Sequence, residues 1–498
     1  MCKINNLRDN PFARFSAEEE ENLRSIFVKP RYYDSLKSNA KQGNSRILVG
    51  QRGLGKSASI HMLFEDLKAN KTLPMLITRY EGIPLLENKG YFLYKIIESL
   101  TKRILEHLYG NSKDLKLLNR DDKKSLAYFV EMFYDDEIAE DYLREAKSIK
   151  AKKRGIWLSR LFNKNLNLIN GVASGAINIT SSIIRQSIGV DTEFDYNEIK
   201  VFDEISIDEI KSLSMQDVVN KGCNRLLSIL KMEIDIALKL NYESIVVLFD
   251  KIDEFSDVSS DINKVADFTL PILKDTDLLY TEHLSIVFSL WSEVKRTLNN
   301  RGVRFDKFQD IDISWRDDEL VKIIDKRLLY YSIDKTTPVT LESLVPIDND
   351  RCTVLKLAGG SPRALISLMS RLYDEERCEN TNGVSVDCFS SDTISRGLVE
   401  FCKRFDYESL QPSKVLERKD YFSWLNKALM MKKPYFTLQE VANEFTIKNA
   451  TAQKYINDMI KLGIISPDMS NGEDDDNVFK VSDPRICYLM TRGVRTLD

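Results

Sequence analysis

Short aliphatic runs alternate along the chain, up to Trp315, with stretches whose apolar positions recur every three or four residues. Such runs are typical of buried parallel strands, and the stretches between them are typical of amphipathic helices. Helices with one apolar face are expected at Ala58–Leu67 and Met215–Leu240. The alternation predicts an α/β fold with a parallel sheet. We expect its strands at Arg46–Val49, Pro74–Tyr80, Ser244–Phe249, Leu284–Ser292 and about Phe308–Ile313.

The pattern becomes helical in two other regions. Residues 88–200 are helical in pattern and heavily charged, which we interpret as an insertion into the α/β core. Beyond Trp315 we expect the helices Asp317–Leu329 and Leu355–Leu372, and a Gly-Ser-Pro-Arg turn that opens a helix. These changes predict five parts: 1–87 and 201–314 as the two halves of the core, 88–200 as a helical insertion, 315–414 as a helical lid and 415–498 as a C-terminal domain.

Composition limits the classes of protein to consider. The chain has 498 residues, 43% of them hydrophobic, and a net charge of −4, so it can bury globular cores and has no overall bias toward nucleic acid. Seven cysteines without a C-x-x-C pair and three histidines predict neither a zinc site nor a disulfide framework. The uncharged stretch from Asn165 to Ile184 is too polar to span a membrane. With a polar N-terminus, we expect a cytoplasmic protein.

The first predicted strand runs directly into Gly-Gln-Arg-Gly-Leu-Gly-Lys-Ser, which matches the phosphate-binding P-loop pattern. Its glycines let backbone N–H groups approach phosphate oxygens, Lys56 neutralises the β and γ phosphates, and Ser57 ligates Mg²⁺. The alternative is an ordinary glycine turn between a strand and a helix. The residues predicted to bind the nucleotide are Gly50, Gln51, Arg52, Gly53, Leu54, Gly55, Lys56, Ser57 and Ala58.

A second motif, the acidic sequence Asp-Lys-Ile-Asp-Glu, follows the predicted strand Ser244–Phe249. A carboxylate at the end of a buried parallel strand suits a water-mediated contact to Mg²⁺, so Asp250 joins Ser57 as a predicted metal residue. Another carboxylate must orient the attacking water. Because Lys251 occupies the position directly after Asp250, that role falls to Asp253 or Glu254.

Further polar residues are candidates for sensing the γ-phosphate. Ser289 and Ser292 end the next strand, although structural hydroxyls are equally consistent there. Arg304, in an arginine-rich loop, suits an arginine finger that reaches a neighbouring subunit. Arg363 stands at the start of the helix opened by Ser361 and Pro362, which also fit an ordinary helix cap.

A segment before the P-loop strand offers aromatic and apolar residues. It contains Phe27, Val28, Pro30, Tyr32 and Tyr33. These residues either pack against the base of a nucleotide or belong to the ordinary core.

The order of these motifs resembles AAA+ or STAND-type P-loop ATPases, particularly the branch similar to origin-recognition ATPases. The resemblance covers residues 20–375 and rests on Gly50–Ser57, Asp250–Glu254 and Arg363. It implies binding of ATP and Mg²⁺, hydrolysis, self-association, and a nucleotide-controlled switch; relatives of this architecture are often linked to defence against phage. Lys251 departs from the glutamate usual in the family, which allows slow hydrolysis.

The C-terminal region has the pattern of a winged helix. Helices are expected at Tyr421–Met431, Leu438–Phe445 and Ala450–Leu462, followed by a hairpin of Gly463–Ile465 and Val478–Val481. The third helix offers Lys448 and Lys454 to nucleic acid. However, Val415–Asp498 carries twelve basic and twelve acidic residues, and the loop Gly472–Asp476 is acidic, so protein contact is an equal alternative.

The insertion carries a basic run that is a second candidate contact for nucleic acid. The run includes Lys150, Lys152, Lys153 and Arg154, although a solvated helix face explains it as well. The leading functional hypothesis is therefore an ATPase that switches assembly and engagement of DNA or a partner protein. The alternative is a scaffold or DNA-binding regulator that holds nucleotide with slow or no turnover.

Overall fold

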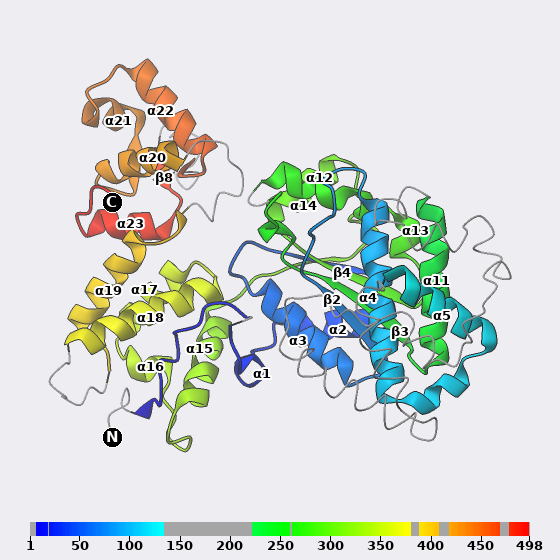
Figure 1. Ribbon diagram of the computed structural model, residues 1–498. Coiled ribbons are helices and arrows are strands. Elements are labelled where there is room, and N and C mark those ends of the chain that lie inside the picture. The colour runs from blue at the N-terminus through cyan, green and yellow to red at the C-terminus, as the bar shows by residue number, and fades with distance from the viewer. Residues whose placement is uncertain are drawn as a thin grey trace, which may run out of the picture.

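The computed structural model describes residues 6–17, 19–133, 222–258, 261–379, 388–407, 418–468 and 478–497. One part of the chain is a sheet covered by helices, a helical region lies beside it, and the C-terminal elements lie beyond that region (Figure 1). The predicted α/β fold with a parallel sheet is confirmed. None of the described helices is long and apolar enough to cross a membrane.

The sheet has five parallel strands in the order β2-β3-β4-β1-β5. Strands β1 to β4 are short and mostly apolar, whereas the edge strand β5 has the sequence Asp-Ile-Asp. Strands β3 and β4 are buried along their whole length. Strands of this kind need cover on both faces, which helices between parallel strands provide. The strands are β1 Arg46–Val49, β2 Thr72–Ile77, β3 Ser244–Phe249, β4 Leu284–Leu290 and β5 Asp310–Asp312.

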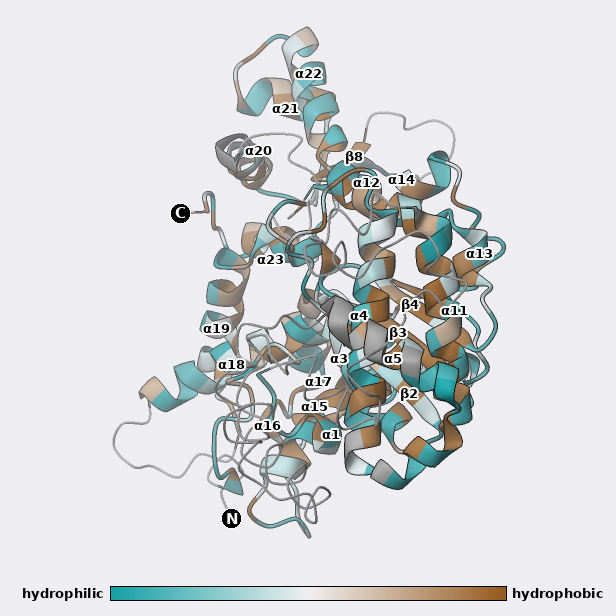
Figure 2. Cartoon of the chain, turned by 45° about the vertical axis from the view of Figure 1, so that its right-hand side comes forward, coloured by the Kyte–Doolittle hydropathy of each residue, from teal (hydrophilic) through white to brown (hydrophobic). Residues whose placement is uncertain are grey.

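Successive side chains of β1 to β4 enter two different cores. In β1, Leu48 packs with α2 and α3, whereas Ile47 and Val49 join the larger core on the opposite face. Figure 2 shows hydrophobic residues of the helices on that face gathered beside the strands. The helices of this part are α1 Leu23–Ile26, α2 Tyr33–Lys41, α3 Lys56–Lys68, α4 Lys89–Gly110, α5 Arg120–Phe133, α11 Cys223–Lys239, α12 Ile262–Leu273, α13 Thr276–Leu279 and α14 Ser292–Asn300, with a 3₁₀ helix at Ser112–Leu117.

Helix α4 begins where the insertion was predicted to begin, yet it belongs to the core of the sheet. Phe92, Leu93 and Ile96 are fully buried in the same cluster as strand residues of β2 and β3, and α4 packs along α11. The described start of the predicted insertion thus covers one face of the sheet. Its basic run, at Lys150, Lys152, Lys153 and Arg154, lies outside the described residues.

Strand β2 differs from its prediction, because it ends at Ile77 and not at Tyr80. Tyr80 leaves the strand and is buried, and its hydroxyl donates to the carbonyl oxygens of Ile77 and Asp250, at 3.0 and 2.7 Å. Burial raises the pKa of this hydroxyl well above its ordinary value. An aromatic residue that follows an apolar run extends the pattern expected of a strand. Tyr80 instead belongs to the loop after β2 and packs into the core from there.

The described residues of the helical region beside the sheet form five helices, together with a strap from the N-terminal segment. Leu7 forms a β-bridge with Ser332, and Phe12 is buried among the same helices. The pattern predicted as Leu355–Leu372 is divided, because Gly359 and Gly360 adopt positive φ values and end one helix before Pro362 begins the next. The helices are α15 Asp317–Tyr331, α16 Leu341–Leu344, α17 Asp348–Ala358, α18 Pro362–Glu379 and α19 Ser391–Lys403.

The C-terminal part contains the three predicted helices and the predicted strand Val478–Val481, together with a further strand, β6. The other hairpin strand was predicted at Gly463–Ile465 and lies at Ile465–Pro467. The strands β6, β8 and β7 pair antiparallel in that order, and α23 packs against α19 and α20. The loop Gly472–Asp476 lies outside the described residues. The elements are α20 Arg418–Met430, β6 Tyr435–Thr437, α21 Leu438–Glu444, α22 Asn449–Lys461, β7 Ile465–Pro467, β8 Val478–Val481 and α23 Pro484–Thr491.

Candidate functional site

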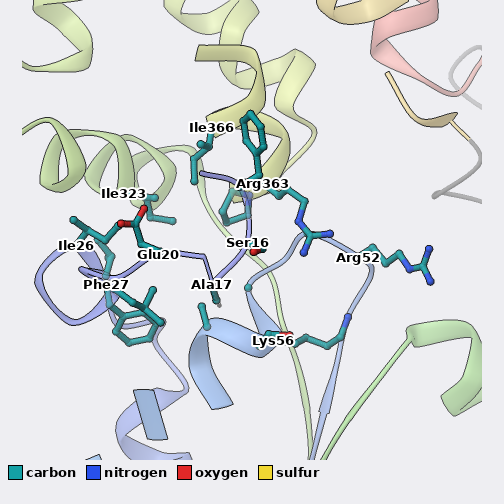
Figure 3. A pocket seen from close by; sticks show the side chains of 18 of the residues that line it. Ser16, Ala17, Glu20, Ile26, Phe27, Arg52, Lys56, Ile323, Arg363 and Ile366 are labelled. Atoms are coloured by element: carbon teal, nitrogen blue, oxygen red, sulfur yellow. The ribbon is translucent and has the colours of Figure 1, made fainter. Parts of the chain in front are cut away.

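A pocket lies at the carboxyl edge of the sheet, between the sheet and the helices α15 and α18 (Figure 3). Strand register creates this edge, since Val49 is paired with Leu290, and Phe249 with Phe288. The residues that follow β1 and β3 therefore emerge at the same edge, on either side of β4, where α/β proteins commonly bind ligands. We call the two ends of the pocket the loop end and the strap end. The loop end is lined by Arg52, Gly53, Gly55, Lys56, Ser57, Ala58, Asp250, Lys251, Asp253 and Glu254. The strap end is lined by Phe15, Ser16, Ala17, Glu20, Leu23, Ile26, Phe27, Val28, Ile323, Arg327 and Ile366.

The loop between β1 and α3 has the backbone of a tight glycine loop. Gly53 and Gly55 have φ values of 83° and 87°, and α3 begins immediately afterwards at Lys56. The Lys56 ammonium donates to the carbonyl oxygens of Gly50 at 2.7 Å and Gln51 at 3.0 Å. Burial lowers the pKa of Lys56 to about 8, against the opposing influence of Asp253 and Asp250.

Asp250 follows β3 and is 1% exposed. The Ser289 hydroxyl donates to its Oδ1 at 2.6 Å, while Oδ2 has no hydrogen-bond partner among the described residues. Of the two hydroxyls predicted as sensors, Ser289 therefore holds the carboxylate of Asp250, whereas Ser292 begins α14. A buried carboxylate oxygen without a partner is costly unless a ligand or ion meets it.

The two candidate catalytic carboxylates lie on one 3₁₀ turn, Ile252–Glu254, which Lys251 precedes with a positive φ of 61°. Asp253 forms an ion pair with Arg52 at 3.5 Å, and the Arg52 guanidinium lies 4.5 Å from the centre of the Trp291 ring. Lys251, Asp253 and Glu254 all line the pocket. The second acidic motif is thus placed opposite the glycine loop.

The helical region contacts the loop directly. The backbone N–H of Arg363 donates to the carbonyl of Gly53 at 3.2 Å, and the Ser361 hydroxyl donates to the same oxygen at 3.3 Å. The Trp315 indole N–H donates to the carbonyl of Leu54 at 2.9 Å. The Arg363 side chain lines the pocket beside Arg52 and Lys56 (Figure 3). Any movement of these helices is therefore mechanically linked to the loop.

The strap end of the pocket is mostly apolar. Figure 3 shows Ile26, Phe27 and Ile323 on the side of the pocket away from Lys56. The sequence left two alternatives for this segment, a place against the nucleotide or a place in the core. Phe27 and Val28 line the pocket. Tyr33, in contrast, is fully buried in the core formed by α2, α3 and the sheet. The apolar segment before the loop is divided between the pocket and the core.

One buried ion pair interrupts this apolar wall. Both terminal nitrogens of Arg327 donate to Oε2 of Glu20 at 2.7 Å, and the side chains are 5% and 2% exposed. Arg327 also donates to the carbonyl oxygens of Pro11 and Arg14. Oε1 of Glu20 has no hydrogen-bond partner among the described residues, although Glu20 lines the pocket.

Several predicted residues lie elsewhere. Arg304 is exposed, pairs with Asp306 at 2.7 Å and does not line this pocket. Gly50, Gln51 and Leu54 do not line it either, and they contribute through backbone contacts to Lys56 and Trp315. Lys448 and Lys454 are exposed at the start of α22.

The residues of the loop end fit a magnesium nucleotide. They combine an ammonium, a hydroxyl at Ser57, the backbone of a glycine loop at the start of α3, and a buried carboxylate oxygen with no protein partner at Asp250. Phosphates are bound by such loops and helix starts, and Mg²⁺ prefers carboxylate and hydroxyl oxygens. The apolar strap end offers a surface on which a planar base can pack.

Sequence reasoning missed the strap end almost entirely. Glu20, Arg327 and Trp315 carry no motif, and Glu20 and Arg327 are 307 positions apart. Ile323 and Ile366 fall on the apolar faces of predicted helices and are indistinguishable there from core residues. Only Phe27 and Val28 carry a signal in the sequence, which is their position ahead of the loop.

No protein-family model and no curated protein sequence matches the chain. Among solved structures it is similar to the Aeropyrum pernix ORC2 protein in its ADPNP-ADP complexes, with a TM-score of 0.40, 9% identity, and coverage of 96% of this chain and 98% of that one. It is also similar to the Thermotoga maritima RuvB Holliday junction branch migration motor, with a TM-score of 0.32, 13% identity, and coverage of 95% and 96%. Likenesses this distant assign neither a family nor an activity, so the pocket residues must support any function.

Proposed function

We propose that this protein binds and hydrolyses ATP with Mg²⁺ in the pocket between the sheet and the helices α15 and α18. The observation that carries the proposal is the meeting, in one pocket, of Lys56, Ser57 and Asp250, whose Oδ2 has no protein partner among the described residues. Lys56 neutralises the phosphates, Ser57 and Asp250 hold the metal, and Asp253 or Glu254 orients the attacking water. When bound, Mg²⁺ supplies charge stabilisation to the transferred phosphoryl group.

The nucleotide state controls the position of the helices α15–α19, which we propose act as a lid. Gly53 lies inside the loop and is contacted by Ser361 and Arg363 of this lid. A γ-phosphate that reorganises the loop must change those contacts, and Arg363 is positioned to respond to its charge. Arg304, exposed on the surface, acts on a neighbouring subunit if the switch assembles a ring or filament.

The C-terminal part is the element through which the switch engages a partner, and we propose that it is a winged helix. The start of α22 exposes Lys448, Asn449, Thr451, Gln453 and Lys454, side chains that suit phosphate and base contacts. DNA and a protein partner remain alternative targets, because this region has no net charge. The resemblance of the sequence extends the proposal to a role in defence against phage.

Substitution of Lys56 tests the proposal. Lys56→Ala is expected to reduce Mg²⁺-dependent ATP hydrolysis to the background rate, because the charge that meets the phosphates is lost. Lys68→Ala, at the half-exposed end of the same helix, is the matched control. The same proteins are tested for DNA binding with and without ATP at two salt concentrations, since a complex held by phosphates weakens as salt rises. Equal hydrolysis by wild type and Lys56→Ala would contradict the proposal.

A second candidate is a scaffold or regulator that binds ATP with little turnover. Two observations favour it: Lys251 occupies the position after Asp250, and Asp253 is paired with Arg52. The ion pair with Arg52 restricts the freedom of the Asp253 carboxylate to orient water. The two candidates are separated by the single-turnover rate of the wild-type protein.

A further inference from the structure

The buried carboxylate of Glu20 is a polar group in the pocket that the proposed hydrolysis does not use. It lies at the strap end, between Ile26 and Ile323, on the side away from Lys56 (Figure 3). Apart from Arg327, its ion-pair partner, and Ser16, the residues of the strap end are apolar, so Glu20 is well placed to distinguish one planar base from another. Selection of a base by Glu20 rests on the proposed function, because it requires a nucleotide to bind in this pocket.

Arg327 fixes the geometry of this carboxylate. Both of its terminal nitrogens converge on Oε2, and its contacts with the carbonyls of Pro11 and Arg14 hold the guanidinium in place. Oε2 is therefore occupied, and Oε1 is the acceptor that remains without a partner among the described residues. A buried charged acceptor held by a rigid partner recognises a donor and rejects an acceptor.

We propose that Oε1 of Glu20 accepts a hydrogen bond from the exocyclic amino group of adenine and thereby selects adenine nucleotides. The 6-position of adenine is an amino donor, whereas the 6-position of guanine or hypoxanthine is a carbonyl acceptor. A 6-carbonyl placed against Oε1 would bring two hydrogen-bond acceptors together in an apolar environment, with no donor between them. Arg327 acts as a positioning residue, because its nitrogens face Oε2 and not the base.

The substitution Glu20→Gln is expected to change the relative affinities of the protein for ATP and inosine triphosphate. The amide oxygen can take the place of Oε2 beside Arg327, which turns the NH₂ group toward the position of Oε1 and replaces an acceptor with a donor. The wild-type protein is expected to bind ATP at least about tenfold more tightly than inosine triphosphate, whose base carries a 6-carbonyl. In Glu20→Gln this preference is expected to vanish or reverse.

Titration calorimetry of ATP, inosine triphosphate and purine riboside triphosphate, which lacks any 6-substituent, provides the measurement. Glu21→Gln is the matched control, because it removes the same charge from the adjacent, exposed residue paired with Arg14, and its preference is expected to equal that of wild type. Thermal unfolding verifies that Glu20→Gln is folded. Equal wild-type affinity for the three nucleotides overturns the inference while leaving nucleotide binding intact, whereas absence of binding to all three overturns the proposed function itself.

Discussion

The two ends of the pocket are built in different ways. The loop end comes from two short continuous segments, each fixed by the strand before it, so that its side chains are rigidly related to the sheet. The strap end is assembled from the N-terminal segment and the helices α15 and α18, which meet only through tertiary packing. The difference teaches that the residues proposed for chemistry are encoded locally, whereas the residues proposed for selectivity and control come from distant parts of the chain. Variants in the acidic turn Ile252–Glu254 should change rates, variants where the lid contacts the loop should change affinity, and variants at the strap end should change base preference.

The largest effect is expected from the acidic turn. Asp253→Ala should lower the single-turnover rate of ATP hydrolysis by roughly 10²- to 10⁴-fold if it orients the attacking water, with little change in ATP affinity. Of the charges around Lys56, Asp253 exerts the largest opposing effect on its pKa, which places it near the ammonium proposed to meet the phosphates. Glu254→Ala should cause the smaller loss.

Rapid-quench measurement of single turnovers gives these rates, and Asp257→Ala, at an exposed neighbouring position, is the control. Unchanged rates in both variants would remove the acidic turn from the chemistry. A wild-type rate near the uncatalysed one would favour the scaffold alternative.

An intermediate effect is expected where the lid contacts the loop. A Cβ at Gly53 would lie 2.6 Å from Oγ of Ser361 and 3.2 Å from Cβ of Arg363, at a φ of +83°. Gly53→Ala should therefore displace the lid and weaken ATP binding by about tenfold, in addition to a strain of about 1–2 kcal/mol from the left-handed backbone.

Gly82→Ala is the control that separates the effect of backbone strain from the effect of disturbed contacts with the lid. Gly82 has nearly the same φ, +82°, with nothing within 4 Å of an added Cβ. We expect both variants to lose thermal stability and only Gly53→Ala to lose affinity. Equal affinities would mean that the lid contacts do not matter for binding.

The smallest effect concerns pH. The pKa of Lys56 is about 8 in the free protein, and bound phosphates must raise it, because the ammonium then faces opposite charge. ATP affinity should therefore be highest below pH 8 and fall several-fold as pH rises from 8 toward 9.5, with proton uptake on binding in that range.

Calorimetry in buffers of different ionisation enthalpy measures this proton uptake. Lys56→Arg keeps its charge throughout the range and should show a flatter pH profile. An identical profile in both proteins would assign the pH dependence to another group.

The sequence predicted most of the sheet and the loop end for a physical reason. Fully buried parallel strands such as Ser244–Phe249 require uninterrupted apolar runs, and a phosphate loop requires glycines and a lysine at fixed spacing. Boundaries were less accurate, as with Tyr80, because an apolar loop residue prolongs a strand pattern. The three-residue strand Tyr435–Thr437 is too short for periodicity to indicate.

The strap end could not be predicted in the same way. Glu20 and Arg327 are individually ordinary charged residues, and nothing in their local sequence indicates that they pair. Trp315 has only its position after the last strand of the sheet as a signal, and its bond to Leu54 spans 261 residues. Such contacts follow from how the lid packs, which local patterns do not encode.

The strap formed by the N-terminal segment also has a consequence for how the protein is made. Arg8 donates to the carbonyl of Tyr330 across 322 positions, and Leu7 pairs with Ser332. During synthesis the sheet, complete at Asp312, can fold while the first residues still await their partners. Closing so long a loop is slow, so the strap end should be the last part of the pocket to mature.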